Sequence, residues 1–250
     1  MTEQYILILG SKPDSMFPDI KVKKIYSANG AAERALDYKL RYPNVPHVAL
    51  ISSREFEEND KVKNRVIKSK PDRIYCSSGS VPIPNELKDT HFETLSIQER
   101  FYFQSKFYKM KSMDIYFGEL LYEKKIFDKI KHIYRCISYK GFDGVTTGLY
   151  SIMLAAVENP EAKIIVSGIG LVEGGHFYEK DAYGYISQRQ VKLIKNGKKT
   201  HGNKYRNTAR SRVERFLVGR FKNNFKKNIL TVDDSMVKYG SIKKWEGGVF

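Results

Sequence analysis

Short apolar runs separated by stretches of helical pattern constrain this chain more than any other feature of its sequence. The first run is Tyr5–Leu9, which is followed by Gly10 and a polar, turn-forming segment. A short run that is apolar at every position is typical of a strand buried on both faces, as in a parallel sheet. The pattern therefore predicts an α/β protein whose first strand leads into a turn.

Six further stretches have the composition of strands, and at least two stretches between them have the spacing of helices. The predicted strands are 24–28, 47–52, 73–76, 133–137, 163–167 and 228–232. The predicted helices are 31–42 and 147–159. Strands that alternate with helices predict a doubly wound sheet of Rossmann type, with helices on both faces. The aromatic-rich stretch 97–122 is interpreted as a helical pair, with an aromatic acceptor platform as the alternative.

The length of 250 residues suits one α/β domain. We expect a Rossmann-type nucleotide-sugar-binding domain over 1–185. Residues 186–250 are expected to complete it with a basic, flexible lid loop over 192–205, an amphipathic helix over 209–225 and a final strand. Neither a run of eighteen apolar residues nor a secretory signal is found, so we expect a cytoplasmic protein. Cys76 and Cys136 are expected to be buried thiols, and the scattered histidines do not have the spacing of a metal site.

The net charge is +16, and residues 186–250 alone carry 17 Lys and Arg against 4 Asp and Glu. A charge of this size predicts a polyanionic partner, an anionic membrane surface or a phosphorylated substrate. One interpretation is a nucleic-acid-binding module, but no RNP, KH or helix-turn-helix signature is found. We therefore expect no nucleic acid and favour peripheral binding to the inner face of the cytoplasmic membrane. The oligomeric state is left open, a homo-oligomer included.

Two glycine-containing segments point to a nucleotide site. The loop that starts at Gly10 and Ser11 could cradle a phosphate, although it has neither the GxGxxG pattern nor the Walker spacing. In the second segment, Thr146, Thr147 and Gly148 stand where a helix begins, which suits binding of a nucleotide. After the strand that follows, Gly168 permits close approach of a backbone. Both segments are expected at the carboxyl edge of the sheet.

The second segment resembles a known family. Thr-Thr-Gly-Leu-Tyr at 146–150 and Ile-Ile-Val-Ser-Gly-Ile at 164–169 are similar to the central motif of the bacterial sialyltransferases of glycosyltransferase family 42. The loop after Gly10 resembles that family's Gly-Asn-Gly-Pro-Ser loop, and Asn29 resembles an Asn that ends its second strand. The resemblance is strongest between residues 146 and 169.

The resemblance implies a sialyltransferase-like fold and a metal-independent enzyme, without a cofactor, that moves an acidic sugar from a CMP donor. The acceptor would be a glycan or lipid-linked glycan in bacterial surface polysaccharide, capsule or lipooligosaccharide synthesis. The expected nucleotide- and donor-binding residues are Gly10, Ser11, Asn29, Ser52, Thr146, Thr147, Gly148 and Gly168. Tyr178 matches a tyrosine that binds the leaving phosphate.

The chain also departs from the family. Ser11, Gly144, Gly170 and Val172 stand where the family has Asn, Arg, Asp and Tyr. Sialic acid, Kdo or a related nonulosonate therefore remain alternative donor sugars. A degenerate homologue that binds nucleotide without activity is a further alternative.

The candidate bases for the acceptor hydroxyl are His201 and His176, because imidazole has a suitable pKa near neutrality. Inversion at the anomeric carbon follows from the family. A carboxylate such as Asp143 or Glu173 would instead allow a retaining, double-displacement reaction.

Overall fold

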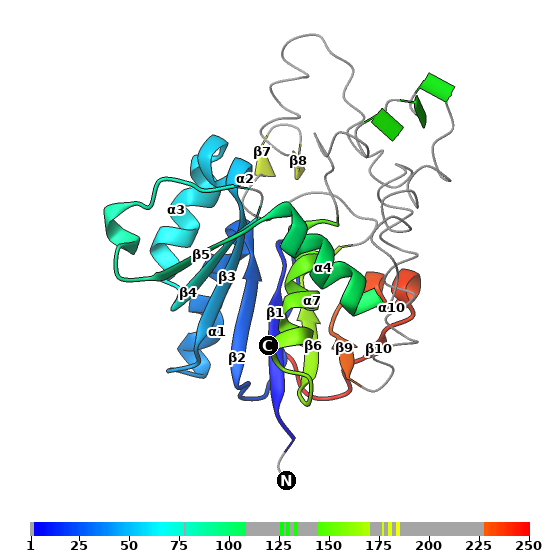
Figure 1. The fold of residues 1–250 in the computed structure, drawn as a ribbon. Helices are drawn as coiled ribbons and strands as arrows, with labels where there is room; N and C mark the ends of the chain where they lie inside the picture. Colours follow the sequence, from blue (N-terminus) through cyan, green and yellow to red (C-terminus); the bar gives the residue numbers. More distant parts are fainter. Residues whose placement is uncertain are drawn as a thin grey trace.

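The computed structural model describes residues 3–77, 79–108, 126–127, 129–130, 133–134, 145–170, 177, 180–181, 184–185 and 228–250. These residues form an α/β fold around one eight-stranded sheet with helices on both faces (Figure 1). All the strand pairs of this sheet are parallel. The predicted α/β class and the Rossmann-like arrangement are thus confirmed.

The strands run in the order β10-β9-β6-β1-β2-β3-β4-β5 across the sheet. Their bounds are β1 (Tyr5–Leu9), β2 (Lys24–Ala28), β3 (His47–Ser52), β4 (Arg73–Ser77), β5 (His91–Leu95), β6 (Lys163–Ser167), β9 (Ile229–Thr231) and β10 (Lys243–Lys244). A separate antiparallel pair is formed by β7 (Lys180–Asp181) and β8 (Gly184–Tyr185). The chain builds outward from β1 to β5 and then returns to place β6 on the other side of β1. The order therefore reverses between β1 and β6.

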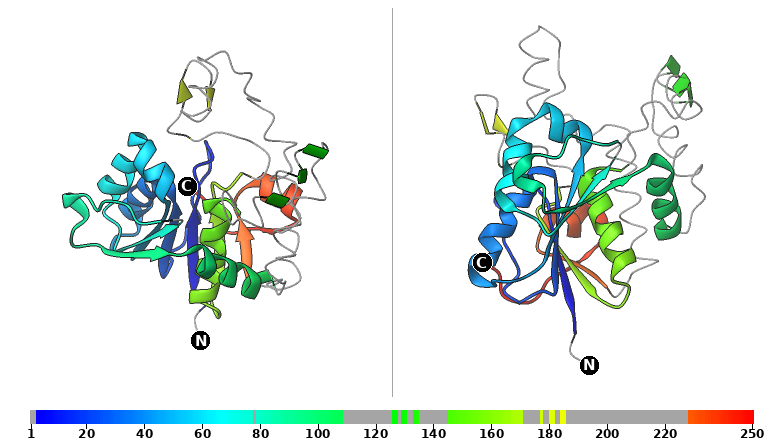
Figure 2. Two further views of the ribbon diagram at one scale, coloured as in Figure 1. Left: turned by 45° about the horizontal axis from the view of Figure 1, so that its top comes forward. Right: turned by 60° about the vertical axis from the view of Figure 1, so that its left-hand side comes forward.

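Helices cover both faces of the sheet, as the right-hand view of Figure 2 shows. Their bounds are η1 (Asn29–Glu33), α1 (Arg34–Arg41), α2 (Ser53–Glu58), α3 (Asp60–Ser69), η2 (Asn85–Leu87), α4 (Ile97–Tyr108), α7 (Thr147–Glu158) and α10 (Asp234–Gly240). The first strand explains why both faces are covered. Ile6 and Ile8 pack in the cluster that contains α7, whereas Leu7 and Leu9 pack in the cluster that contains α1. A strand buried on both faces needs a helical layer on each.

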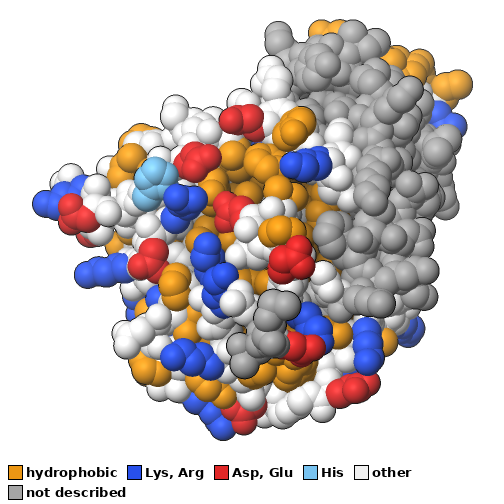
Figure 3. Space-filling view, turned by 60° about the horizontal axis from the view of Figure 1, so that its bottom comes forward, with side chains coloured by type: hydrophobic (Ala, Val, Ile, Leu, Met, Phe, Trp, Pro, Cys, Tyr) orange, Lys and Arg blue, Asp and Glu red, His pale blue; other side chains and the backbone are white. Residues whose placement is uncertain are grey.

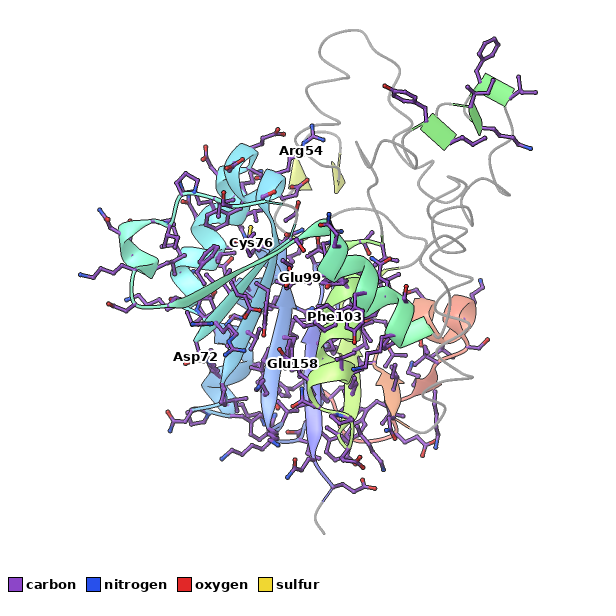
Figure 4. All side chains as sticks on the ribbon, viewed as in Figure 1. Arg54, Asp72, Cys76, Glu99, Phe103 and Glu158 are labelled. Carbon is purple, nitrogen blue, oxygen red and sulfur yellow. The ribbon has the colours of Figure 1, made fainter. Side chains whose placement is uncertain are left out.

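Helix α7 is held against the sheet at its carboxyl end, far from the helix start (Figure 4). The hydroxyls of Tyr26 and Tyr75 both donate to the Glu158 carboxylate, Tyr75 at 2.5 Å. Burial and these bonds raise the pKa of both phenols, that of Tyr75 to about 12. Glu158 thereby ties α7 to β2 and β4. The amino-terminal turn of the helix is thus positioned at the other end of the strands, where their carboxyl ends lie.

Most of the predicted elements agree with the structure, with several differences. The predicted strand 133–137 is wrong where it is described, because Ile133 and Tyr134 are helical. The predicted helix 31–42 starts as the 3-10 turn η1 and continues as α1. Strands β5 and β10 and helices α2, α3 and α10 were not predicted. Of the predicted helical pair 97–122, helix α4 is described, and residues 109–122 lie outside the described part.

The carboxyl-terminal residues belong to the same sheet, since β9 pairs with β6 and β10 with β9. The predicted lid loop 192–205 and helix 209–225 lie outside the described residues. Cys76 is a buried free thiol, and Cys136 is not described. Within the described ranges, no helix is long and apolar enough to cross a bilayer.

The lower face of the molecule in Figure 3 carries basic and acidic side chains interspersed with apolar ones. This is the end of the sheet where the strands begin, opposite their carboxyl ends. The charge excess of the chain is therefore not concentrated among the described side chains of this face.

Candidate functional site

The loops after β1 and β6 meet at the carboxyl edge of the sheet, where the strand order reverses. The Gly10 amide donates to the Ser167 carbonyl at 2.7 Å, and the Lys12 amide donates to the Gly168 carbonyl at 2.8 Å. In open parallel sheets, ligands bind in the crevice outside the strand ends at this position. The first and second glycine segments identified in the sequence thus lie side by side.

The contact between these loops requires glycine. A Cβ on Gly10 would lie 2.2 Å from the Gly168 carbonyl oxygen. Gly168 has a φ of +84°, and a Cβ there would lie 2.3 Å from the Arg34 guanidinium. Residues with a side chain rarely adopt this φ. Neither overlap can be relieved without moving the backbone or the buried guanidinium of Arg34. The two glycines therefore permit the close approach that the sequence predicted for Gly168.

The start of α7 joins the same group of residues. A Cβ on Gly148 would lie 3.4 Å from the Ile169 side chain, and the same side chain lies next to the Cα of Gly10. Ile169 thus lies between the β1 loop and the first turn of α7. Three of the predicted donor-binding residues, Gly10, Gly148 and Gly168, are brought together in this way.

The first turn of α7 provides the anion-binding features. Thr146 is the N-cap residue, and its hydroxyl accepts from the Leu149 amide at 3.4 Å. The amides of Thr147 and Gly148 belong to the first turn, where helix geometry offers no intrahelical acceptor. The positive end of the helix dipole lies here too, so this turn favours a negatively charged group. Thr146, Thr147 and Gly148 are all partly exposed.

Asn29 and Ser52 lie at the same edge of the sheet, on the side of β1 away from β6. Asn29 has a φ of +50°, and its Oδ1 accepts from the Ser52 amide at 2.8 Å. Asn is one of the few residues that tolerate this backbone conformation. The bond ties the end of β2 to the end of β3. Besides the predicted role of both residues in nucleotide binding, the side-chain oxygen of Asn29 thus has a structural role.

A buried arginine organises the loops beneath the site. The Arg34 guanidinium donates to the carbonyl oxygens of Gly10 at 2.9 Å and Ser15 at 2.5 Å, and to the Ser167 hydroxyl at 3.2 Å. Burial lowers the pKa of Arg34 to about 10, and the Asp233 carboxylate opposes that effect. The guanidinium therefore remains charged at neutral pH and fastens the β1 loop to β6.

Asp233 is the acidic partner of this cluster and is buried after β9. Its carboxylate accepts from the Gly168 amide at 2.6 Å and from the Ser15 hydroxyl at 2.7 Å. The Lys12 ammonium lies 3.8 Å from the same carboxylate, and its side chain is 21% exposed. Lys12 of the β1 loop thus lies beside Asp233, with its side chain partly exposed.

The carboxyl-terminal tail holds the far side of the β1 loop. Phe17 and Phe250 exchange backbone hydrogen bonds of 2.8 and 2.9 Å, and their rings pack together. The Arg41 guanidinium lies over the Phe250 ring at 4.7 Å. Together with Arg34 and Asp233, the tail fixes a loop that would otherwise be an exposed connection.

The four predicted catalytic residues, His201, His176, Tyr178 and Asp143, lie outside the described residues, and so does Glu173. Phe177, the neighbour of His176 and Tyr178 in the chain, is described. Its amide donates to the Ser11 carbonyl at 3.0 Å, and its ring packs on the cluster between β3, β4 and α3. The chain at Phe177 therefore reaches the β1 loop.

Sequence reasoning assigned no role to Lys12, Arg34 or Asp233. Arg34 follows Ala31 and Ala32 in a stretch of small, core-facing residues, where a charged side chain is unusual and signals a buried partner. Asp233 directly follows a predicted strand, which is the position of the other edge residues. Both signals were present in the sequence, but the partners were not. Arg34 contacts Gly10, 24 residues away, and Ser167, 133 residues away, and Asp233 contacts Gly168, 65 residues away.

No protein-family model matches the chain, and no curated protein or solved structure shows significant similarity to it. What the site binds must therefore be inferred from the chemical groups that it presents. It combines helix amides, hydroxyls and a lysine at the switch point of a parallel sheet, which suits a phosphate group linked to a nucleoside. No cluster of three or more potential metal ligands occurs within the described ranges.

Proposed function

We propose that the protein is a glycosyltransferase that moves an acidic sugar from a CMP donor to a glycan acceptor. The observation that carries the proposal is the convergence of Gly10, Gly168 and the first turn of α7 at the switch point. The segments that meet there are the ones that resemble the sialyltransferase family. Sialic acid, Kdo and related nonulosonates share a carboxylate and a CMP leaving group, so the proposal covers that class of donors.

The phosphate of CMP is assigned to the first turn of α7. As the glycosidic bond to the phosphate breaks, negative charge grows on the leaving CMP. The amides of Thr147 and Gly148, the Thr147 hydroxyl and the Lys12 ammonium supply positive or hydrogen-bonding partners for that charge. Because Arg34 and Asp233 hold the β1 loop in place, Lys12 needs little reorganisation to contribute.

The nucleoside is assigned to the edge that runs from Gly10 and Ser11 to Asn29 and Ser52. On the acceptor side, His201 or His176 would remove the proton of the attacking hydroxyl, and Tyr178 would support the leaving phosphate. Direct attack by the acceptor inverts the anomeric carbon. If Asp143 or Glu173 attacks first, a covalent glycosyl-enzyme forms and configuration is retained.

The decisive experiment is a comparison of CMP, UDP and ADP in thermal unfolding of the whole protein. A ligand that binds only the native state raises the melting temperature in proportion to ln(1 + [L]/Kd). We expect CMP to give the largest shift. An equal or larger shift with UDP or ADP would contradict the choice of a CMP donor.

A variant links that shift to α7. Thr147→Val removes a hydroxyl and keeps the shape of the side chain, so the fold is retained. Loss of one hydrogen bond to a charged phosphate weakens affinity by roughly 10- to 100-fold, from about 1.5–3 kcal/mol. Thr94→Val makes the same chemical change at an exposed position on β5 and should leave CMP binding unchanged. Equal CMP affinity in the two variants would show that the first turn of α7 does not bind the phosphate.

A further inference from the structure

The connection between β1 and β2 contains no helix. Parallel strands are usually joined by a helix that packs on one face of the sheet. Residues 10–23, the β1 loop, are all described and make this connection as turns and irregular chain. The first half of the loop carries Lys12 and borders the candidate site, and the second half leads back to β2. Other segments must therefore hold the loop in place.

Helix α1 holds the second half of the loop. The Tyr42 hydroxyl donates to the Asp19 carboxylate at 2.6 Å, and the Tyr38 hydroxyl donates to the Ile20 carbonyl. Phe17 connects the two halves. The contacts with α1 lie beyond Phe17, in the part of the loop that leads away from the site. Phe17 is therefore the residue through which the fixed half of the loop meets the half at the site.

Residues 245–250, the tail, pack on Phe17. The two backbone hydrogen bonds between Phe17 and Phe250 are 2.8 and 2.9 Å long, and the ring centroids of these residues are 5.4 Å apart. The Asp19 amide donates to the Gly248 carbonyl at 2.7 Å. In the right-hand view of Figure 2 the end of the tail lies beside α1, and its aromatic residues pack on the cluster that contains this helix. The tail thus supports the loop where the two halves join.

The tail is attached through an aromatic residue at each end. Trp245 and Phe250 are partly buried, whereas residues 246–249 between them are exposed. The Trp245 ring packs edge-on against Tyr5 at 5.6 Å. Segments with few buried apolar contacts and exposed backbone hydrogen bonds open locally at a low cost in free energy. The end of the tail at Phe250 can therefore leave the loop without unfolding of the sheet.

Three packed groups connect Phe250 to the candidate site. The Phe250 ring packs on the Phe17 ring, and the Arg34 guanidinium lies over that second ring at 4.7 Å from its centroid. The same guanidinium donates to the Gly10 carbonyl at 2.9 Å and to the Ser167 hydroxyl at 3.2 Å. A cation over an aromatic ring is attracted to it, so the position of the Phe17 ring affects the position of the guanidinium. Energetic coupling between sites is carried by contiguous contacts of this kind.

We propose that Phe250 is a positioning residue of the candidate site. Its ring keeps Phe17 against Arg34, and Arg34 holds the half of the β1 loop that carries Lys12. Release of the tail loosens that half of the loop and weakens the binding of an anionic ligand, although no group that touches the ligand is removed. The effect on CMP affinity rests on the proposed function, whereas the effect on the loop does not. By linkage, a ligand at the site also strengthens docking of the tail.

The first test is hydrogen exchange of the full chain without ligand. The amides of Gly10 and Lys12 donate to carbonyls of the segment after β6, so their exchange reports on the contact between the two loops. Coupling between two sites typically corresponds to a factor of about 5–150. In Phe250→Ala, exchange at both amides should be about fivefold faster or more. The matched control Phe92→Ala removes a partly buried ring on β5 from another cluster and should leave these rates unchanged.

The second test is the dissociation constant of CMP for the same proteins. It should rise by about fivefold or more in Phe250→Ala and remain at the wild-type value in Phe92→Ala. Phe250→Leu keeps an apolar side chain and should lie between the wild type and Phe250→Ala in both tests. Addition of CMP to the wild type should slow exchange at the Phe250 amide, which donates to the Phe17 carbonyl.

Two results would overturn the proposal. Exchange at Gly10 and Lys12 could be unchanged in Phe250→Ala, or it could be equally fast in Phe92→Ala, which would indicate a general loss of stability. Equal CMP affinity in Phe250→Ala and the wild type would refute the role of Phe250 in binding. If the wild type does not bind CMP, the proposed function fails, and the exchange rates still decide whether Phe250 positions the loop.

Discussion

Substitution of Gly168 by alanine tests the geometry on which the site depends. The residue has a φ of +84°, and an alanine in a left-handed conformation costs about 1–2 kcal/mol. Its Cβ would also lie 2.3 Å from the Arg34 guanidinium and 2.5 Å from the Gly10 carbonyl oxygen. Overpacking of this kind costs typically about 1–3 kcal/mol. The free energy of unfolding should therefore fall by about 2–5 kcal/mol in Gly168→Ala.

Gly148→Ala is the matched control and should have the opposite sign. Gly148 lies in the first turn of α7, and its added Cβ would make ordinary contacts with Ile169 at 3.4 Å and beyond. Replacing a helical glycine with alanine typically stabilises a protein by about 0.4–1 kcal/mol. An added methyl group is thus expected to destabilise the protein at position 168 and to stabilise it at position 148.

Urea unfolding and thermal melting measure both variants. For a chain of this size, 1 kcal/mol corresponds to about 2–4 °C in melting temperature. Gly168→Ala should melt roughly 5–20 °C below the wild type, and Gly148→Ala should melt slightly above it. If Gly168→Ala were as stable as the wild type, the close contact of the β1 and β6 loops would be refuted.

Two further predictions concern histidines. Burial lowers the pKa of His47 to about 3, and its Nε2 lies 2.7 Å from the Ser27 hydroxyl. The unfolded state takes up this proton near pH 6.5, so stability is full above about pH 6.5 and falls by about 1.4 kcal/mol for each pH unit below it. Urea unfolding should show that the free energy of unfolding falls by about 2 kcal/mol between about pH 7 and pH 5. His47→Gln should remove this fall, and the exposed control His91→Gln should retain it. If the free energy of unfolding of His47→Gln depended on pH as in the wild type, the assignment to His47 would be contradicted. If His201 is the base, His201→Ala should lower kcat by about 10²–10⁴-fold with little change in CMP affinity, and the reverse result with His176→Ala would exchange the two roles.

The main features of the sheet could be predicted from local patterns. The runs Tyr5–Leu9, Lys24–Ala28, His47–Ser52 and Lys163–Ser167 were predicted with the bounds that the structure has. Each is buried nearly throughout, so its composition alone separates it from helices and loops. The start of α7 was likewise predicted at Thr147, because a capping threonine precedes a long apolar helix.

Strand β5 and the stretch 133–137 show where local patterns fail to predict the secondary structure. Strand β5 lies at the edge of the sheet, and four of its five residues are at least partly exposed. Its sequence, from His91 to Leu95, therefore lacks the continuous apolar run that identified the inner strands. The stretch 133–137 has the apolar residues of a strand, but Ile133 and Tyr134 are helical, and residues 135–137 lie outside the described part.

Local periodicity in the sequence determined which segments become strands and helices, because the spacing of apolar residues depends only on neighbours in the chain. It also placed Gly10, Asn29, Ser52 and Gly168 at strand ends. Only the tertiary structure decided that β6 returns to the side of β1, and with it that Gly10 and Gly168 touch. The same return brings Arg34 and Asp233 together beneath the site. These contacts join residues that are far apart in the chain, and such pairings depend on packing of the whole sheet, which no local pattern encodes.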